Sequence, residues 1–548
     1  MTHTNQATAR SGAKALIEAL DAQGVTTIYG VPGEETTALM AAIGESGLTF
    51  VLCRHEQSAA FMASVYGRLT GKPAVCLATL GPGATNLVTG VADAQLDHVP
   101  LIAITGQGAR ARLSRESHQI IDLEALFAPV AKLSRTVLDA DDIPASTAEA
   151  WRLACEEKPG AVHLCLPEDV AAKETDAPIC PSSVLPAPLV PDASLEAIGQ
   201  QLRGAERPVI VAGAGVLRAN AAAEIRRFAE RHSISVATTF MAKGILPKDH
   251  PQMLFTLGQP EPDVTDHALS AADLVLAVGF DPVEFDALTL TEDGARLAAL
   301  GLRPTPVDSG WQLAAEAAGD IAAALEDLSR ALDGQTWPMV PTFDAARQGL
   351  VSELGRRQTK SDRGPVAPAD LCAAISGAIG EEDIVLSGVG LHKLWIARHV
   401  MAKRPGQVIV PNGLAGMGLA LPGAIAAAQI SEQGRVLAVC GDGDVMMNVQ
   451  EMETASRLGL RLTVMVWVDG GYGLIDDHQG DSHADFKFNA PLWAKLAQSF
   501  GWTHAHIEGV ADVPGLLRAG LTAEGSTLLT VDVDYAASGG LPTRKMVA

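Results

Sequence analysis

The sequence predicts an α/β protein with three doubly wound, parallel-sheet domains. Patterns typical of strands and of helices alternate along almost all of the 548 residues, as expected of parallel sheets with helical crossovers. Two proline-rich stretches, 175–191 and 337–368, are typical of extended linkers and divide the chain into units of ordinary domain size. We therefore expect domains at residues 1–180, 190–340 and 365–548.

Composition excludes several classes of function. The net charge of −23 argues against binding to nucleic acid or to an anionic membrane. Seven scattered cysteines without a CxxC spacing indicate reduced thiols, most of them in a core. The first residues lack the apolar run of a signal peptide, and the apolar stretch 417–430 is too short to span a bilayer. We therefore expect a cytoplasmic protein.

The first element is an amphipathic helix. Ala13, Leu16, Ile17 and Leu20 follow the i, i+3, i+4, i+7 spacing of one helix face, and the pattern stops at Gly24. The next residues, VTTIYGV, have the composition of a strand.

The middle domain opens with a strand and a glycine turn, RPVIVAGAGVLRA. Gly213 and Gly215 supply only two of the three glycines of a dinucleotide fingerprint. The sequence therefore favours a structural Rossmann-like domain, with a bound nucleotide as the alternative.

In the last domain, an apolar strand leads to Gly441-Asp442-Gly443, a helix follows, and a second apolar strand ends at Asp469. Both aspartates should therefore lie at the carboxyl ends of neighbouring parallel strands, where α/β sheets bind ligands. Carboxylate ligands suit Mg²⁺ or Ca²⁺, and Mg²⁺ commonly shares its shell with phosphates. The alternative is a plain strand-to-helix turn.

This segment resembles the signature of thiamine diphosphate (ThDP) enzymes, in which a second oxygen ligand follows the GDG aspartate after about 27 residues. The segments RHE, at residues 54–56, and GPGATNL, at residues 81–87, resemble the pyrimidine-binding domain of the acetolactate synthase group. The resemblance extends over nearly the whole chain. It implies a Mg²⁺ ion held by Asp442, Asp469 and the carbonyl of Gly471.

The resemblance also implies that Glu56 is catalytic. In the family a glutamate hydrogen-bonds a pyrimidine nitrogen of the cofactor and so promotes removal of the thiazolium proton. A carboxyl group in an apolar pocket has a raised pKa and can share a proton near neutrality. The strand before Glu56 and the helix after it are apolar enough to form such a pocket. Without the resemblance, a solvent-facing glutamate in a turn would be the simpler interpretation.

Two further residues are candidates for catalysis. Gln119 matches a glutamine near the reacting centre of the family, although it could be a polar residue of a surface loop. His478 lies in a loop that departs from the family pattern and could handle protons or bind the second substrate. A solvated loop explains His478 equally well, and the nearby Asp476 and Asp477 would disfavour a carboxylate substrate unless they point outward.

The remaining implied residues contact the cofactor. His392 would bind the diphosphate and Met417 would wedge beneath the thiazolium, although a structural histidine and simple core packing are the alternatives. The full set of implied cofactor contacts is Val31, Pro32, Gly33, Gly81, Gly390, His392, Asn412, Met417, Gly443, Asp444, Val445 and Tyr472.

One segment indicates which subgroup of the family the chain resembles. Biosynthetic members bind FAD and carry an RFDDR-like segment after a middle-domain strand, where this chain has residues 280–285, FDPVEF. That segment resembles the catabolic, FAD-independent acetolactate synthases, so the resemblance implies that FAD is absent. It implies joining of two molecules of pyruvate, a 2-oxoacid, to give 2-acetolactate with loss of carbon dioxide. It also implies a homodimer, or a dimer of dimers, whose sites are shared between subunits.

Three alternatives stay open. The first is a flavin-dependent 2-oxoacid oxidase on the same three domains. The second is a ThDP decarboxylase, or a carboligase that uses an aldehyde acceptor. The third is a non-catalytic binding protein that keeps the fold.

Overall fold

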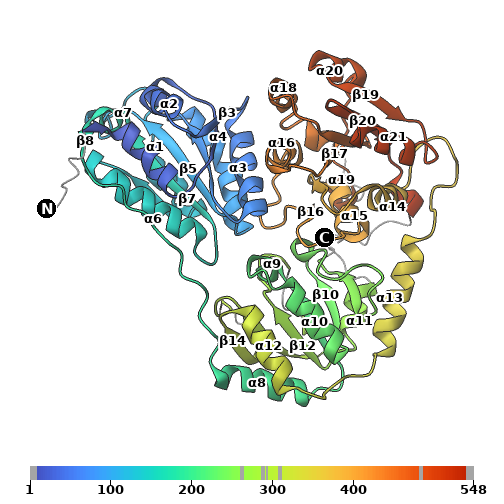
Figure 1. Ribbon diagram of the computed structural model, residues 1–548. Coiled ribbons are helices and arrows are strands. Elements are labelled where there is room, and N and C mark those ends of the chain that lie inside the picture. Colours follow the sequence, from blue (N-terminus) through green and yellow to red (C-terminus); the bar gives the residue numbers. More distant parts are fainter. Residues whose placement is uncertain are drawn as a thin grey trace. The chain divides into compact units, whose positions relative to one another are not determined.

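The computed structural model describes residues 9–258, 264–285, 290–291, 294–306, 312–479 and 485–538. Over these residues, helices alternate with three six-stranded sheets in which all paired strands run parallel (Figure 1). In each sheet the first strand lies inside, and the chain builds outward on one side before it crosses to the other. The predicted α/β class with three doubly wound sheets is therefore confirmed.

The N-terminal sheet has the order β3-β2-β4-β5-β7-β6. Its central strands are buried along their whole length, as the apolar runs in the sequence require. The strands are β2 (Thr27–Gly30), β3 (Thr49–Leu52), β4 (Ala74–Ala78), β5 (Leu101–Gln107), β6 (Leu133–Thr136) and β7 (Ala161–Pro167). A short antiparallel pair, β1 (Arg10–Ser11) and β8 (Glu174–Thr175), lies beside this sheet.

Helices cover both faces of the N-terminal sheet (Figure 1). One face carries α1 (Gly12–Ala22), α2 (Thr37–Gly44), α6 (Ile143–Cys155) and α7 (Glu168–Ala172), and the other carries α3 (Glu56–Thr70), α4 (Pro82–Leu96) and α5 (Leu123–Phe127). The predicted first helix is confirmed as α1, because Ala13, Leu16, Ile17 and Leu20 are all buried.

The chain packs into two compact units. The first contains Met1–Leu185 together with Gly413–Ile430 and Asn448–Leu458, and the rest of the chain forms the second. Within the first unit, α16 (Ala420–Ile430) packs against α3, and α18 (Glu451–Arg457) packs against α16. Two helices from the last third of the sequence thus belong to the unit built around Glu56.

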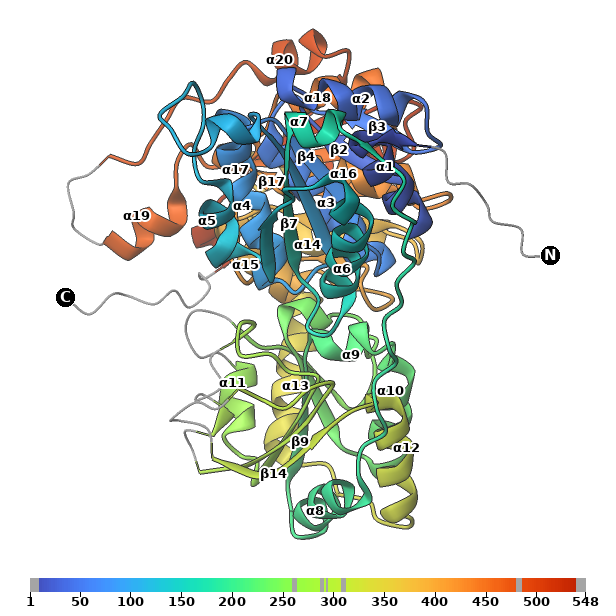
Figure 2. The ribbon, with the colours of Figure 1, turned by 90° about the vertical axis from the view of Figure 1, so that its left-hand side faces the viewer.

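The central sheet, in the second unit, has the order β11-β10-β9-β12-β13-β14. Its strands are β9 (Pro208–Ala212), β10 (Ser235–Thr238), β11 (Met253–Thr256), β12 (Leu274–Val278), β13 (Arg296–Gly301) and β14 (Leu313–Ala318). Figure 2 shows helices on both sides of it: α8 (Asp192–Arg203), α10 (Ala222–His232) and α12 (Ile321–Ala331) on one face, α11 (Val264–Leu269) and α13 (Pro341–Leu354) on the other. The short helix α9 (Ala214–Arg218) follows β9 directly.

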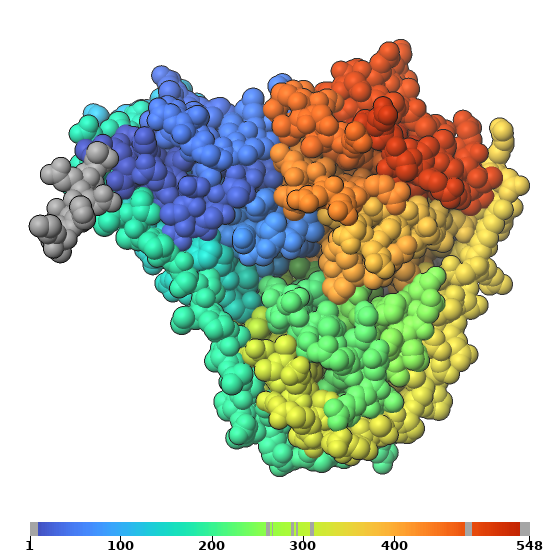
Figure 3. Space-filling view, viewed as in Figure 1, coloured from blue at the N-terminus to red at the C-terminus, as the bar shows by residue number. Residues whose placement is uncertain are grey.

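The prediction of an extended linker at residues 337–368 is wrong. The stretch 337–368 contains the helix α13, in which Pro341 takes the first helical position and Phe343, Ala346 and Leu350 are buried. Proline is tolerated there because the first N–H groups of a helix have no partner within it. The stretch after Thr175 has no helix or strand up to Pro191 and follows the surface as a blue-green strip in Figure 3.

The C-terminal sheet has the order β16-β15-β17-β18-β20-β19. Its strands are β15 (Ile384–Ser387), β16 (Val408–Ile409), β17 (Val436–Gly441), β18 (Thr463–Val468), β19 (Thr503–Ile507) and β20 (Thr527–Asp532). Besides α16 and α18 of the first unit, the helices that follow its strands in the chain are α15 (Leu391–His399), α17 (Asp442–Val445), α19 (Gly473–Gln479), α20 (Trp493–Ser499) and α21 (Val513–Leu521), and α14 (Pro368–Ala378) precedes them.

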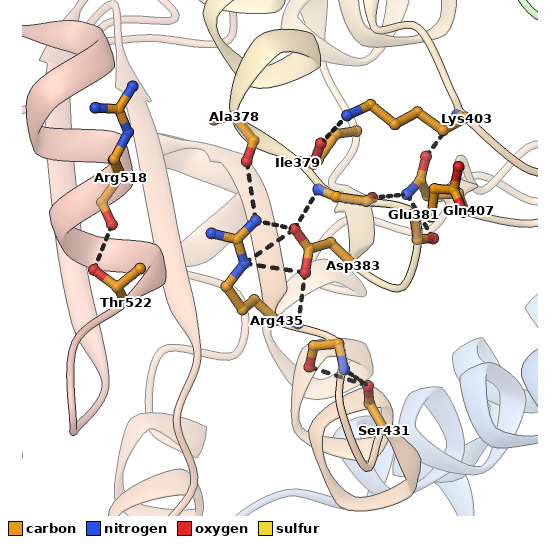
Figure 4. Close-up of polar contacts among 12 residues, drawn as sticks. Ala378, Ile379, Glu381, Asp383, Lys403, Gln407, Ser431, Arg435, Arg518 and Thr522 are labelled. Carbon is orange, nitrogen blue, oxygen red and sulfur yellow. Dashed lines mark hydrogen bonds and ion pairs between the residues drawn. The ribbon is translucent and has the colours of Figure 1, made fainter.

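An ion pair fixes the amino edge of this sheet. Asp383 and Arg435 come directly before the neighbouring strands β15 and β17, and Arg435 Nε donates to both Asp383 oxygens at 3.1 and 3.0 Å (Figure 4). Arg435 also donates to the carbonyl of Ala378 at 3.0 Å. Burial raises the pKa of Asp383, but hydrogen bonds from Arg435 and Gly380 outweigh it and hold the pKa below its usual value. The carboxyl edge is left for ligands.

The cysteines and helices agree with the composition. All seven cysteines are unpaired thiols, and five of them are buried. Over the residues that the structure describes, the helices are too short or too polar to cross a bilayer.

Candidate active site

Glu56 is the first residue of α3 and follows the edge strand β3 after a turn of three residues. His55 caps this helix, and its Nδ1 accepts the N–H of Gln57 at 3.1 Å. The Glu56 side chain is buried, and its Oε2 accepts a hydrogen bond from Asn86 Nδ2 at 2.9 Å. The expected apolar surroundings come from the buried helix, whereas Leu52 at the end of β3 is exposed.

The sequence reasoning missed Asn86. This residue lies in the first turns of α4, and it belongs to the GPGATNL segment that the sequence singled out for its glycines. Gly83 in the same segment makes room for the carboxylate, because a Cβ there would lie 3.3 Å from Glu56 Oε1 and 3.0 Å from Thr79 Cγ2. The signal was therefore present, but spacing alone does not show that an amide four residues into a helix reaches Glu56.

Four other predicted residues of this unit gather at the switch point between β2 and β4, where the strand order reverses. Val31, Pro32 and Gly33 follow β2, and a Cβ on Gly33 would lie 2.5 Å from the side chain of Thr79. Gly81 follows β4 and has a φ of +52°.

Gln119 lies against the same turn. A Cβ on Gly81 would lie 2.8 Å from the carbonyl oxygen of Gln119. Gln119 is exposed and has a φ of +57°, a left-handed conformation that costs a non-glycine residue about 1 kcal/mol or more. The structure therefore brings Gln119 beside the glycine turn of the Glu56 unit.

The two predicted metal ligands, Asp442 and Asp469, lie together in the second unit. They follow the neighbouring strands β17 and β18. Asp442 accepts N–H groups from Gly443 and Gly470, each at 2.9 Å, and its carboxylate also contacts that of Asp469. Burial raises the pKa of Asp442. Burial and the negative charge of Asp442 raise the pKa of Asp469 to about 7.

This pair fits a divalent cation. Asp442 is buried and Asp469 is half-buried, so their touching carboxylates repel each other, and a bound cation would relieve both the repulsion and the loss of hydration. Over the described part of the chain, no group of three or more His, Cys, Asp or Glu side chains could hold a metal ion. Further ligands would therefore be backbone oxygens, such as that of Gly471, or oxygens of a bound ligand.

Two predicted cofactor residues hold the backbone of the same turns. His392 is buried and its Nε2 accepts the N–H of Gly441 at 3.2 Å, while burial lowers its pKa to about 3 and keeps the ring neutral. Asp444 is buried and its Oδ1 accepts the N–H of Val389 at 3.0 Å. The turns after β15 and β17, at the switch point of this sheet, are therefore tied together by side chains.

The remaining predicted contacts surround these turns. Gly390 precedes α15 as its N-cap residue, with a φ of +151°, and Val445 is buried in α17. Gly443 faces the ring of Tyr472, because a Cβ there would lie 2.7 Å from Tyr472 Cε1. Asn412 donates to the carbonyl of Glu284 at 2.7 Å.

Met417 and His478 lie elsewhere. Met417 belongs to the Glu56 unit, and its carbonyl accepts a hydrogen bond from Gln57 at 3.3 Å. The backbone of His478 is part of α19, but its side chain lies outside what the structure describes. On the same helix, Asp476 pairs with Lys487 at 3.0 Å.

The glycine turn of the central sheet is filled by a side chain. Glu284 is buried, and its Oε1 accepts N–H groups from Ala214 at 3.0 Å and Asp281 at 3.2 Å. Thr239 donates to its Oε2 at 2.5 Å, and burial raises the pKa of Glu284 to about 7. A Cβ on Gly213 would lie 2.5 Å from Phe280 Cα. This glycine therefore allows close packing of two turns around a carboxyl group.

Comparison with known proteins identifies this arrangement. Models of the thiamine pyrophosphate enzyme match in three places: the N-terminal TPP binding domain at residues 10–126, the central domain at 195–328 and the C-terminal TPP binding domain at 388–531. An acetolactate synthase of Bacillus subtilis is 31% identical over 98% of this chain and 95% of its own length. The chain belongs to the ThDP-dependent acetolactate synthase family.

Other relatives span the family. The catabolic acetolactate synthase of Raoultella terrigena is 28% identical over 96% of this chain and 95% of its own length. The large subunit of acetolactate synthase isozyme 2 of Escherichia coli is 32% identical, with 96% of each chain covered. The protein is therefore a ThDP-dependent enzyme that acts on small molecules.

Proposed function

We propose that the protein joins two molecules of pyruvate to give 2-acetolactate and carbon dioxide, with ThDP and Mg²⁺ as cofactors. The Glu56–Asn86 hydrogen bond carries this proposal, because it places a buried carboxyl group beside the GPGATNL turn typical of acetolactate synthases. Alignment of acetolactate synthases over nearly the whole chain supports it.

The chain's own residues would act as follows. Glu56 holds a proton at a pyrimidine nitrogen, and Asn86 fixes the direction of its carboxyl group. Asp442, Asp469 and the Gly471 carbonyl hold Mg²⁺ and thereby the diphosphate. When bound, ThDP supplies a nucleophilic carbon and an electron sink for decarboxylation.

Other residues orient the substrates. Gln119, beside the Gly81 turn, and His478 are proposed to lie near the reacting atoms. The proposed cofactor contacts include Met417 beneath the thiazolium and Tyr472 beside the GDG turn.

We propose further that the enzyme works without FAD. Glu284 accepts the hydrogen bond from the backbone N–H of Ala214 at the glycine turn. Without Glu284, this N–H group would be free to bind an anion such as a phosphate. The carboxyl group of Glu284 occupies this turn, and its negative charge would repel the pyrophosphate of a bound FAD. The proposed domains of each chain are residues 1–180, 190–340 and 365–548. The proposed quaternary structure is a homodimer, or a dimer of dimers. In it, one subunit supplies the residues that bind the pyrimidine of each cofactor, and the partner subunit supplies the residues that bind the diphosphate.

The test is a pyruvate assay on purified protein with ThDP and Mg²⁺ but without FAD, together with a visible spectrum. Acetolactate from colourless protein is the expected result. Absorbance near 450 nm and consumption of oxygen would instead favour a flavin-dependent oxidase. Failure to turn over any 2-oxoacid despite bound ThDP would favour a binding protein.

A second candidate is a ThDP-dependent decarboxylase or carboligase with another acceptor. The departure of residues 473–479 from the family pattern favours it, whereas the ion pair between Asp476 and Lys487 offsets one of the negative charges that would disfavour a carboxylate substrate. Release of carbon dioxide or acetaldehyde without acetolactate would support this candidate.

A further inference from the structure

A buried carboxylate of α18 holds the turn that precedes Glu56. Glu451 has no exposed surface, and its Oε1 accepts the backbone N–H groups of Arg54 at 3.0 Å and of His55 at 3.1 Å. Its Oε2 accepts a hydrogen bond from Thr454 Oγ1 at 2.6 Å. All of these residues belong to the first compact unit.

Other residues of the same segment hold positions on both sides of Glu56. Asn448 is buried, and its Oδ1 accepts a hydrogen bond from Ser58 Oγ at 2.9 Å. Arg457, at the end of α18, donates to the carbonyl of Leu52. The segment 448–457 therefore contacts the chain before and after Glu56.

The energetics favour a specific role for Glu451. A buried carboxylate costs several kcal/mol unless hydrogen bonds replace its hydration, and hydrogen bonds to a charged acceptor are about twice as strong as neutral ones. Glu451 uses these bonds on two consecutive N–H groups, so it fixes the backbone directly before the first residue of α3.

We propose that Glu451 is a positioning residue that sets the direction of the Glu56 carboxyl group. The inference rests on the catalytic role proposed for Glu56. Because the N–H groups of Arg54 and His55 fix the chain one and two residues earlier, their release would let Glu56 turn away from Asn86. A displacement of about 1 Å at a catalytic group can cost about a hundredfold in rate.

Three variants test the proposal. Glu451→Ala removes the acceptor, Glu451→Gln keeps one oxygen for both N–H groups, and Glu45→Gln makes the same change at an exposed ion pair of the same unit. In cofactor-free protein, hydrogen–deuterium exchange measures protection of the amides at residues 54 and 55. With ThDP and Mg²⁺ added, exchange of the cofactor's thiazolium proton for deuterium measures the action of Glu56 without any 2-oxoacid.

We expect Glu451→Ala to lose amide protection at residues 54 and 55 and to slow thiazolium proton exchange about tenfold to a hundredfold. Glu451→Gln should keep both to within about threefold of wild type, and Glu45→Gln should change neither. If Glu451→Ala does not fold, Glu451→Asp replaces it, because the shorter side chain keeps the charge but cannot reach both N–H groups.

Wild-type proton exchange in Glu451→Ala, or in Glu451→Asp where that replaces it, would overturn the proposal. Equal losses in the Ala and Gln variants would also overturn it, because charge rather than hydrogen bonding would then matter. The proposed function fails separately. Wild-type protein that exchanges the thiazolium proton but forms no acetolactate would refute the substrate, and Glu56→Gln with undiminished exchange would refute the role of Glu56.

Discussion

The carboxyl groups of Asp442 and Asp469 touch each other at the ends of two neighbouring strands. Backbone N–H groups of Gly443 and Gly470 hold Asp442 in place, so the pair cannot simply turn apart. A bound divalent cation would stabilise such a pair of carboxylates. Metal affinity is therefore the most direct test of the proposed role of Asp442 and Asp469.

Substitution of the two aspartates should weaken binding of metal and cofactor to different extents. Asp442→Ala should weaken binding of Mg²⁺ and ThDP about a hundredfold, because it removes a ligand and leaves two N–H groups without an acceptor. Asp469→Asn keeps an oxygen ligand and removes the repulsion, so binding should stay within about tenfold of wild type. Titration calorimetry with both ligands measures this. Equal losses in the two variants would contradict the assignment.

Asn86→Ala tests the orientation of Glu56. The variant removes the hydrogen bond to Glu56 Oε2, so kcat should fall about tenfold or more while KM for pyruvate changes little. Thr85→Ala, one residue earlier, removes only a bond to the carbonyl of Pro82 and serves as the control. An unchanged kcat in Asn86→Ala would show that Glu56 needs no such support.

Glu284 should make stability depend on pH. Burial raises its pKa from 4.5 to about 7, so the folded protein binds more protons than the unfolded chain between these values. This contribution is full below pH 4.5 and is lost as the pH rises through about 7. Compared with Glu284→Gln, wild-type protein should gain up to about 3 kcal/mol of unfolding free energy on going from pH 8 to pH 5. Chemical unfolding at the two pH values checks this, and a constant difference would refute it.

At the amino edge of the C-terminal sheet, we expect the opposite pH dependence of stability, because Asp383 stabilises the protein only while it is charged. Asp383→Asn should destabilise the protein by about 1–3 kcal/mol at pH 7, because it breaks the ion pair between the buried Asp383 and the half-buried Arg435. Since the pKa of Asp383 lies below its ordinary value, the effect should be complete above pH 4 and fade as the pH falls further. Midpoints of thermal unfolding across this range measure it. Metal affinity should not change.

Local patterns predicted much of this molecule. The first helix, the three parallel sheets and the meeting of Asp442 with Asp469 follow from apolar periodicity and from the rule that ligands bind at carboxyl ends of parallel strands. The helix α13 was missed because proline suits a first helical turn as well as a linker.

Long-range contacts could not be predicted in this way. Asn86 and Glu451 reach the Glu56 turn from helices 30 and nearly 400 residues away along the chain, and periodicity says nothing of such pairings. Glu284 likewise fills the glycine turn of the central domain through tertiary packing, which the two glycines alone did not indicate.

The segment that holds Glu56 also holds Met417. Gln57 donates to the carbonyl of Met417, and Asn448 bridges Ser58 to the carbonyl of Gly418. In the dimer proposed above, Glu56 and Met417 of one chain would serve two different sites. A few hydrogen bonds inside one chain would then connect residues of two different sites, and binding at one site measured with the other filled is the test for coupling between them.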